Sequence, residues 1–262
     1  MASAAFWLVT AACVPRGAFA YDVEVEGVGP VWMYPEELEL LAKHLRQART
    51  FFEFGMGAST LYISKEYPHL ERLVSVDMDR RWVNRVRKHS WLRNGSGPAP
   101  KQISLLHIHI GRTTGYGFPL QNMSRCRHRI RLCLDPDANP GCAVKTRCYK
   151  DLIGRRSWWP PFSQVVLDAA AHFKHGWDVV LVDSRFRTAC ALKSLMAISS
   201  EAISRSVVMV HDYTIRRQHY QEIERFANME EVVGSLAVFR KKPDFDPVAL
   251  QHAVLASEYD PM

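Results

Sequence analysis

The chain has 262 residues, of which 47% are hydrophobic, and Lys plus Arg exceed Asp plus Glu by 34 − 27 = 7. This length and composition favour one globular domain with a large core and room for an insertion. No apolar run reaches the ~18–20 residues that a membrane-spanning helix needs, so a transmembrane helix is not expected.

The N-terminus carries a candidate leader. An apolar run of 11 residues, Ala4–Val14, is followed by Ala18-Phe19-Ala20, which has the small-x-small pattern of a cleavage site. Residues 1–20 are therefore predicted to be a signal peptide, with the mature chain beginning at Tyr21 in the secretory lumen (endoplasmic reticulum or Golgi) or outside the cell. No Lys or Arg precedes the apolar run, which leaves a plastid leader or a cytoplasmic protein open as alternatives.

The first half of the chain alternates predicted helices and strands. A helix is expected over 35–49, where Pro35 suits the first turn and leucines recur on one face. A buried strand follows over 50–54, and Gly55 and Gly57 mark a tight turn. The remaining elements of this half are a helix over 59–67, a strand over 73–76, a basic helix over 80–89 and a strand over 103–110.

This first crossover predicts an adenosine-containing ligand. A strand, a glycine turn, a helix and a second strand ending in an acid form the unit with which parallel α/β sheets bind such cofactors. Asp77 ends the second strand 20 residues after Gly57, where its carboxylate can accept hydrogen bonds from both ribose hydroxyls. The third glycine of the dinucleotide fingerprint G-x-G-x-x-G is missing. A cofactor without phosphate is therefore favoured, although an NAD-linked oxidoreductase on the same sheet stays open as the rival.

Residues 111–161 interrupt the alternation. They hold ten Lys or Arg against three Asp, so their surplus equals that of the whole chain. Four clustered cysteines predict two disulfides of undetermined pairing. A zinc site is the weaker alternative because no C-x-x-C pair occurs. No Phe, Tyr or Trp accompanies the arginines of 125–131, so a nucleic-acid partner is not expected. The cysteines are Cys126, Cys133, Cys142 and Cys148, and glycosylation sequons begin at Asn94 and Asn122.

The second half resumes the alternation and ends in a hairpin around Gly234-Ser235. Cys190, within an apolar helix, is expected to be a small buried hydrophobe. With this half, the chain has seven predicted strands. Its predicted elements are a helix over 162–174, a strand over 177–182, a helix over 189–203, a strand over 207–210, a helix over 219–228 and a hairpin of strands over 231–233 and 236–240.

Several of these stretches resemble class I S-adenosylmethionine (SAM) methyltransferases. Residues 53–59, Glu-x-Gly-x-Gly-x-Ser, resemble their first motif, and 177–183 resemble the fourth motif of small-molecule O-methyltransferases. The stretches 183–187 (Asp-Ser-Arg-Phe-Arg), 211–213 (His-Asp-Tyr) and 111–119 are similar to those of a largely uncharacterised group, with Ser184 in place of a glycine.

The resemblance covers roughly 35–242 and implies the fold class. It implies an α/β protein with a doubly wound, Rossmann-like sheet of seven strands in the order 3-2-1-4-5-7-6, the last strand antiparallel. It also implies a single methyltransferase domain over 21–262, within which 111–161 form a Cys/Arg-rich insertion.

Ligands of open α/β sheets bind at the carboxyl ends of the strands, so the site is expected to combine distant segments. The resemblance implies that SAM is bound by Glu53, Gly55, Gly57, Ser59, Asp77 and His109. It implies that Asp183, His211 and Asp212 are catalytic, and the substrate is expected to contact Arg185, Arg187 and Tyr213.

Three roles are open for the residues after the fourth and fifth strands. In metal-dependent relatives an acid at the place of Asp183 binds Mg²⁺, and an acidic pair follows the fifth strand, where this chain has His211-Asp212. Asp183 and Asp212 are thus candidate ligands of Mg²⁺ or Mn²⁺, which would lower the pKa of an acceptor hydroxyl. Without a metal, His211 would be the general base. The third possibility is a pair that only caps the next helix.

These observations predict a SAM-dependent methyltransferase that transfers a methyl group to an oxygen of a small-molecule or carbohydrate acceptor. Arginines after the fourth and fifth strands favour an anionic acceptor such as an acidic sugar, because guanidinium groups bind carboxylate and sulfate in bidentate geometry. The alternative is that one arginine binds the cofactor carboxylate and the others are solvated. A non-catalytic binding protein that kept the fold is the other open alternative.

Overall fold

The structure is a computed structural model that describes residues 23–89, 91–92, 98–111, 113, 119, 158–172 and 176–262. The predicted leader, both sequons and the four clustered cysteines lie outside the described residues. Within the described residues, no helix is both long enough and apolar enough to cross a lipid bilayer.

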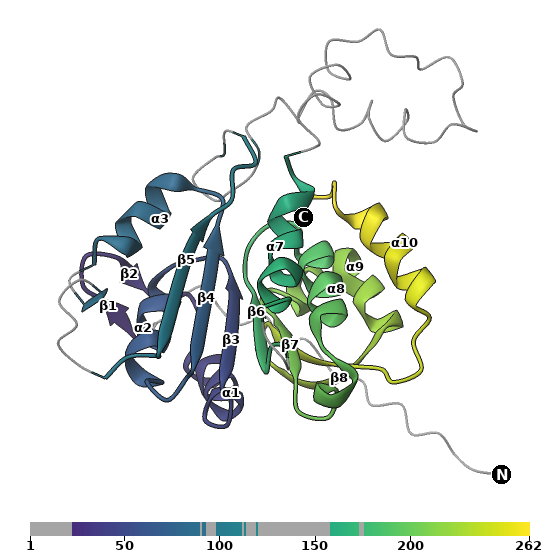
Figure 1. The fold of residues 1–262 in the computed structure, drawn as a ribbon, viewed down its shortest axis with the longest axis horizontal. Coiled ribbons are helices and arrows are strands. Elements are labelled where there is room, and N and C mark those ends of the chain that lie inside the picture. The colour runs from purple at the N-terminus through teal and green to yellow at the C-terminus, as the bar shows by residue number, and fades with distance from the viewer. Residues whose placement is uncertain are drawn as a thin grey trace, which may run out of the picture.

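Seven strands form one sheet in the order β5-β4-β3-β6-β7-β9-β8 (Figure 1). Numbered along the chain within this sheet, the order is 3-2-1-4-5-7-6, which confirms the prediction. The first five strands are parallel, whereas β9 is antiparallel to both of its neighbours. The strands are β3 (Thr50–Phe54), β4 (Arg72–Asp77), β5 (Gln102–His107), β6 (Val179–Val182), β7 (Val207–Val210), β8 (Ala227–Val233) and β9 (Leu236–Lys241).

Helices cover both faces of this sheet (Figure 1), because its central strands are apolar on both sides. Phe51 of β3 packs in the core beside α1 and α2, whereas Phe52 and Phe54 pack on the opposite face against α7, α8 and α10. This two-residue alternation is the signature of a strand buried on both sides. The helices are α1 (Pro35–Leu45), α2 (Ala58–Glu66), α3 (Arg80–Arg87), α7 (Pro160–Ala170), α8 (Arg187–Ala197), α9 (Arg217–Tyr220) and α10 (Pro247–Ser257).

The glycine turn after β3 fastens three strand ends together. Gly55 has φ +106°, and a Cβ there would lie 2.2 Å from the carbonyl oxygen of Asp183. Its N–H donates to the carbonyl of Val76 at 2.9 Å, and the N–H of Asp183 donates to the carbonyl of Phe54 at 2.8 Å. Glycine is therefore required here by the fold itself, because only a residue without a side chain lets β3 and β6 approach so closely.

Several predicted elements end earlier or begin later in the structure, among them the helices predicted over 162–174 and 189–203, which end at Ala170 and Ala197. Two others are shortened for identifiable reasons. The helix predicted over 35–49 ends at Leu45, because the side chain of Asp178 accepts hydrogen bonds from the N–H groups of Arg49 and Thr50 at 2.8 and 3.0 Å. The strand predicted over 103–110 ends at His107, which pairs with the last residue of β4, so its ladder has no partner further on.

The helix predicted over 219–228 is wrong over most of its length. It is replaced by the short helix α9, a 3-10 turn over Gln221–Arg225 and the start of β8 at Ala227. Pairing of Ala227 with Lys241 extends the hairpin, so a tertiary contact overrides the local helical pattern. Two further elements escaped prediction, namely the small hairpin of β1 (Glu24–Val25) with β2 (Gly29–Pro30), and α10.

Candidate functional site

The carboxyl ends of β3, β4, β6 and β7 lie next to one another in the sheet. They bring together the glycine turn, Asp77, Asp183 and the His211-Asp212 pair, which are as much as 157 positions apart in the sequence. The sequence predicted this gathering from the general rule for parallel sheets.

Glu53 holds the glycine turn from inside the protein. Its side chain is fully buried, and it accepts hydrogen bonds from the hydroxyls of Ser59 (2.5 Å), Ser75 (2.7 Å) and Thr60. The hydroxyl of Thr60 in turn accepts from the N–H of Gly57 at 2.9 Å. Burial raises the pKa of Glu53 to about 7, although the three hydroxyls act in the opposite direction. Glu53 thus supports the turn through its neighbours.

Asp77 lies half-buried at the end of β4. Its Oδ1 accepts a hydrogen bond from the N–H of Asp79 at 2.7 Å. Burial raises the pKa of Asp77 to about 7, and the hydrogen bond from Asp79 opposes this shift only partly. A raised pKa in a carboxyl group at a strand end is typical of a binding position.

The turn is bounded by α3 on one side. The indole Nε1 of Trp82 donates a hydrogen bond to the carbonyl of Met56. A Cβ added to Gly57 would lie 3.5 Å from that indole nitrogen, which is an ordinary contact, and the φ of Gly57 is −170°, which any residue adopts. Unlike Gly55, Gly57 is therefore not required by the fold.

His109 and Trp158 meet at the same edge of the sheet. His109 follows β5, Trp158 precedes α7, and their ring centroids are 5.2 Å apart. The side chain of Trp158 is 40% exposed. The residue pair that follows β5 and precedes α7 therefore lies beside the strand ends that bear the candidate site.

Arg187 lies between the two aspartates that were predicted as metal ligands. Its NH2 donates to Oδ1 of Asp183 at 2.9 Å, and its NH1 donates to Oδ2 of Asp212 at 2.8 Å. The side chain of Arg187 is 5% exposed, whereas those of both aspartates are 26% exposed. The charges of Asp183 and Asp212 raise the pKa of Arg187 despite its burial. The guanidinium of Arg187 is therefore buried, whereas the two carboxylates that it binds remain partly exposed.

His211 forms a second bridge, to Glu37 of α1. Its Nδ1 lies 3.1 Å from Oδ1 of Asp183, and its Nε2 lies 3.3 Å from Oε2 of Glu37. Burial acts to lower the pKa of His211, but the charge and hydrogen bond of Asp183, followed by Glu37, raise it to about 10. His211 is therefore protonated at neutral pH, and both ring nitrogens donate to carboxylates. A protonated imidazole cannot act as a general base.

Glu37 was not predicted as part of the site. Its side chain is fully buried and accepts hydrogen bonds from the N–H of Tyr34 (2.9 Å) and from the N–H and hydroxyl of Ser235 (2.6 and 2.9 Å). In the sequence, Glu37 looks like an ordinary acidic residue in the first turn of a helix. Only its contact with His211, which follows β7 and lies 174 positions away, distinguishes Glu37 from such an acid.

Two residues of the site have a left-handed backbone that non-glycine residues rarely adopt. Phe186, directly before Arg187, and Asp212 both have φ +58°. The ring of Phe186 is held in the core by Trp159 and Phe162, at centroid distances of 5.5 and 6.3 Å. Such a conformation costs about 1–3 kcal/mol and persists only where the surroundings enforce it. One strained residue precedes Arg187 and the other is Asp212, so the two strained residues flank or form the Arg187–Asp212 contact.

The remaining predicted substrate residues differ in accessibility. The hydroxyl of Tyr213, whose side chain is 1% exposed, donates to Glu224. Arg187 and Tyr213 thus point into the protein, and their predicted contact with substrate gains no support. Arg185 is half-buried, and its burial and the charges of Arg187 and Arg216 lower its pKa to about 10. It remains a candidate contact for an anion.

Asp183, His211 and Asp212 have ligand atoms within 4.8 Å of one another, close enough to share one ion. Their donor set does not fit a metal in the arrangement seen. A ligand histidine must be neutral with one free nitrogen, whereas both nitrogens of His211 bind carboxylates. Arg187 already takes one oxygen of each aspartate.

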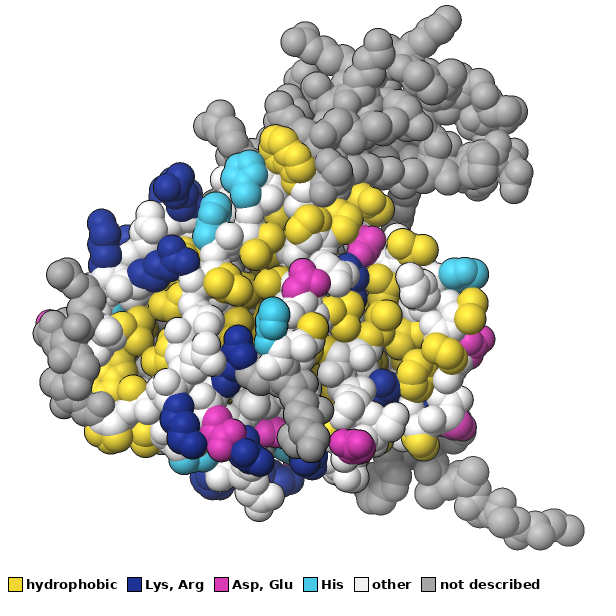
Figure 2. Space-filling view, viewed as in Figure 1, with side chains coloured by type: hydrophobic (Ala, Val, Ile, Leu, Met, Phe, Trp, Pro, Cys, Tyr) yellow, Lys and Arg dark blue, Asp and Glu magenta, His cyan; other side chains and the backbone are white. Residues whose placement is uncertain are grey.

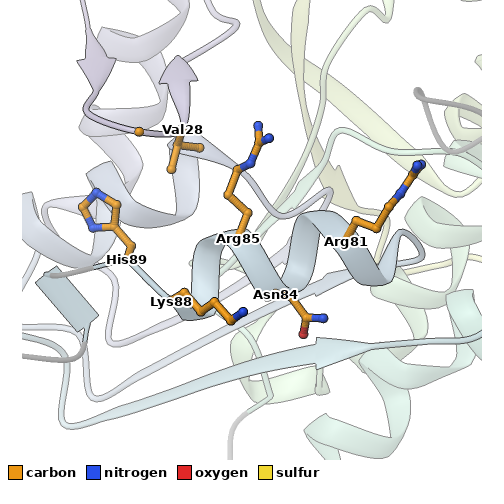
Figure 3. Close-up of a pocket in the computed structure, with 7 residues that line it drawn as sticks. Val28, Arg81, Asn84, Arg85, Lys88 and His89 are labelled. Carbon is orange, nitrogen blue, oxygen red and sulfur yellow. The ribbon is translucent and has the colours of Figure 1, made fainter.

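One cavity within the described residues, of about 470 Å³, lies along α3 opposite the β1–β2 hairpin and not at the strand ends (Figure 3). Lys and Arg side chains gather over this helix (Figure 2). The cations of the cavity do not converge, because Lys88 and Arg85 point to different sides of the helix (Figure 3). Arg81 is paired with Asp79 at 3.1 Å. This cavity is separate from the candidate site.

No protein-family model and no curated protein sequence matches this chain. Among solved structures, a methyltransferase-like protein from Silicibacter pomeroyi is similar, with a TM-score of 0.64 and 24% identity over 88% of this chain and 97% of that one. The N-methyltransferase NodS from Bradyrhizobium japonicum (TM-score 0.39, 12% identity, 79% and 94% covered) and the O-methyltransferase from Bacillus cereus in complex with SAH (TM-score 0.36, 12% identity, 80% and 82% covered) are too distant to add an argument. The chain therefore has the Rossmann-like methyltransferase topology.

Proposed function

We propose that the chain is a SAM-dependent methyltransferase that methylates a hydroxyl group of a small-molecule or carbohydrate acceptor. The observation that carries this proposal is the placement of the Gly55–Gly57 turn and Asp77 on adjacent strand ends, directly beside two partly exposed carboxylates. The fold supports the proposal, since this topology places ligands at that edge.

The residues at the ends of β3 and β4 fit the cofactor. SAM, when bound, supplies an electrophilic methyl group on a sulfonium sulfur. Asp77 would accept hydrogen bonds from the ribose hydroxyls. Gly57, which the fold does not require to be glycine, would let the backbone approach the ligand. Glu53 and Ser59 would keep the turn in that position, and His109 would border the ligand near β5.

The residues at the ends of β6 and β7 would act on the acceptor. The exposed edges of Asp183 and Asp212 can accept a hydrogen bond from its hydroxyl and orient the oxygen for in-line transfer, so that positioning supplies much of the rate. The hydroxyl proton would pass to Asp212 or to water, because the charges of His211 and Arg187 outweigh burial and hold the pKa of Asp183 below its ordinary range. His211, being protonated, would hold Asp183 in place instead of serving as the base.

An anionic acceptor such as an acidic sugar fits the cations near these carboxylates. Arg216 lies close enough to Arg185 for its charge to contribute, after burial, to the lowered pKa of Arg185. An anion between two guanidinium groups relieves that repulsion.

We further propose that the chain enters the secretory lumen. The predicted leader over residues 1–20 and the four clustered cysteines support this proposal.

Calorimetric titration with SAM, SAH and NAD tests the proposal. SAM and SAH are expected to bind the wild type, and Asp77→Ala is expected to weaken both by about 10- to 100-fold, the value of a pair of charge-assisted hydrogen bonds. Glu71→Ala, an acid just before the opposite end of the same strand, is the matched control and should bind like the wild type. Binding of NAD alone would support an oxidoreductase, and binding of none would favour a protein without this chemistry.

A further inference from the structure

We propose that the guanidinium group of Arg187 takes the place of the divalent cation that the Asp183–Asp212 pair would otherwise hold, so that this site works without a metal. The inference rests on the proposed function for its catalytic meaning, but its structural content concerns only residues of this chain.

The first argument is geometric. Arg187 donates one hydrogen bond to each aspartate, at 2.8 and 2.9 Å, and so bridges the carboxylates as an ion would. Any cation that bridged the same two groups would have to stand within a few ångströms of the guanidinium. Two positive charges at that distance repel each other strongly in a partly buried site. Metal and arginine are therefore mutually exclusive occupants.

The second argument is the way the backbone builds this contact. Phe186 is locked in a left-handed conformation by its ring in the core, and the next residue, Arg187, is the first of α8. Asp212 adopts the same unfavourable conformation at the other partner. A strained backbone persists only where its surroundings enforce it. Because Phe186 and Asp212 are both strained, the fold itself holds Arg187 against the aspartates, and the bridge is not a chance surface ion pair.

The third argument is the burial of the bridge within a continuous cluster. Glu37, His211, Asp183, Arg187 and Asp212 form one chain of contacts of 3.3, 3.1, 2.9 and 2.8 Å. Asp183 and Asp212 both face the guanidinium of Arg187. A divalent ion at the two oxygens that Arg187 holds would have to displace a side chain that is only 5% exposed, and an ion at the other two oxygens would lie beside its charge.

The bridge also leaves specific atoms for an acceptor. Arg187 and His211 take Oδ1 of Asp183, and Arg187 takes Oδ2 of Asp212. Among the described residues, Oδ2 of Asp183 and Oδ1 of Asp212 accept no hydrogen bond, although Oδ1 of Asp212 lies 3.9 Å from Nδ1 of His211, so both oxygens can accept from a substrate hydroxyl. Arg187 is thus a positioning residue, because it acts through the two aspartates and does not itself reach the acceptor.

Binding of Mn²⁺ tests the proposal without any acceptor. One equivalent of Mn²⁺ added to the wild-type protein, with and without SAM, is followed by the paramagnetic resonance signal of the free ion. We expect no loss of that signal and no change of the unfolding midpoint on adding EDTA. A stoichiometric loss of the signal that Asp212→Asn abolishes would overturn the proposal.

Arg187→Met provides the complementary measurement. The variant keeps much of the side-chain volume but removes the charge, so the aspartates lose their bridge. We expect a lower unfolding midpoint and the appearance of Mn²⁺ binding that Asp183→Asn removes. If the Arg187→Met variant folds but binds no Mn²⁺, the proposal that Arg187 takes the place of a divalent cation is refuted. Arg205→Met, which removes an exposed arginine at the other end of the sheet, is the control and should gain no binding.

The outcomes separate this inference from the proposed function. If Arg187→Met does not fold, the wild-type Mn²⁺ titration decides alone. SAM binding is read in the same samples by calorimetry, so its failure would reject the methyltransferase proposal while the Mn²⁺ result still judges the role of Arg187.

Discussion

Asp77 and Glu53 carry carboxyl groups whose pKa values burial has raised to about 7. They differ in access, because Glu53 is fully buried under three hydroxyls and Asp77 keeps a partly exposed position at the strand end. This difference divides their roles at the residue scale. Glu53 shapes the turn, and Asp77 is available to a ligand.

The raised pKa of Asp77 predicts pH-dependent cofactor binding. The ribose hydroxyls prefer the ionised carboxylate, which the free protein loses as pH falls below about 7. Affinity for SAM should therefore increase as pH rises from 5.5 to 7, by up to ~10-fold per pH unit, and level off above. Calorimetry across this range measures it. Asp77→Asn should bind weakly with a flatter profile, and an unchanged slope in this variant would assign the titration to Glu53 instead.

His211 predicts a stability effect of defined sign. Its folded-state pKa of about 10 lies above the ordinary 6.5, so the protonated ring contributes stability that is complete below pH ~6.5 and is lost as pH rises through 10. The difference in unfolding free energy between wild type and His211→Gln should accordingly shrink between pH 6 and pH 10. Urea denaturation at several pH values measures this. A difference that does not vary with pH would show that His211 is neutral in the folded protein.

At the scale of elements, Glu37 joins three parts of the fold. It lies on α1, it accepts two hydrogen bonds from Ser235 in the turn between β8 and β9, and it meets His211 after β7. A Cβ on Gly234 would lie 2.6 Å from Oε1 of Glu37, so the turn is shaped around this carboxylate.

Removing this carboxylate should be costly. Glu37→Ala would leave the N–H groups of Tyr34 and Ser235 and the charge of His211 without their partner, and should reduce the unfolding free energy by about 3–5 kcal/mol. Glu36→Ala, on the exposed side of the same helical turn, should cost at most ~1 kcal/mol. Chemical denaturation of both variants gives the comparison. Equal losses would mean that Glu37 acts only through the helix dipole.

The two glycines of the crossover predict opposite phenotypes. Gly55→Ala meets both a left-handed backbone and a carbonyl oxygen at 2.2 Å, and should destabilise the protein by about 2–5 kcal/mol. Gly57→Ala should leave stability within ~1 kcal/mol but weaken SAM binding. Thermal unfolding and calorimetry on each variant measure the two effects. Full SAM affinity in Gly57→Ala would remove this position from the binding loop.

At the scale of the whole molecule, His109, just after β5, and Trp158, just before α7, meet beside the candidate site. Specificity-determining segments of α/β enzymes commonly lie at this edge of the sheet. The insertion predicted over 111–161, and its role in selecting the acceptor, stay a prediction, because most of that segment, including its cysteines, lies outside the described residues.

The predicted leader and disulfides give a test by thiol counting. Cleavage before Tyr21 would remove Cys13 and leave five cysteines, of which four are predicted to pair. Protein expressed through a secretory route, unfolded without reductant and alkylated, should then show one labelled cysteine by mass spectrometry, Cys190, and five after reduction. Cys190 is free and buried. Five labels without reductant would instead support thiols, as in the zinc alternative.

The sequence by itself determined the seven strands of the main sheet and the edge of that sheet where the candidate site lies. The apolar run of β3, the glycine turn and the acid at Asp77 are local patterns, and a parallel sheet converts such patterns into position by a general rule. The position of the half of the candidate site from Glu53 to Asp77 could therefore be outlined in advance, while its role in cofactor binding stays a prediction. Cys190 was correctly expected to be buried.

Only the tertiary structure decided the roles of His211, Arg187 and Glu37. His211 was expected to serve as a base or to cap a helix, yet it bridges Asp183 and a glutamate 174 positions away. Arg187 was expected to face a substrate, yet it lies buried between two aspartates. Charge and residue type are local properties, whereas a pKa and an ion pair depend on which distant groups share a low-dielectric space, and that is fixed only when the chain has folded.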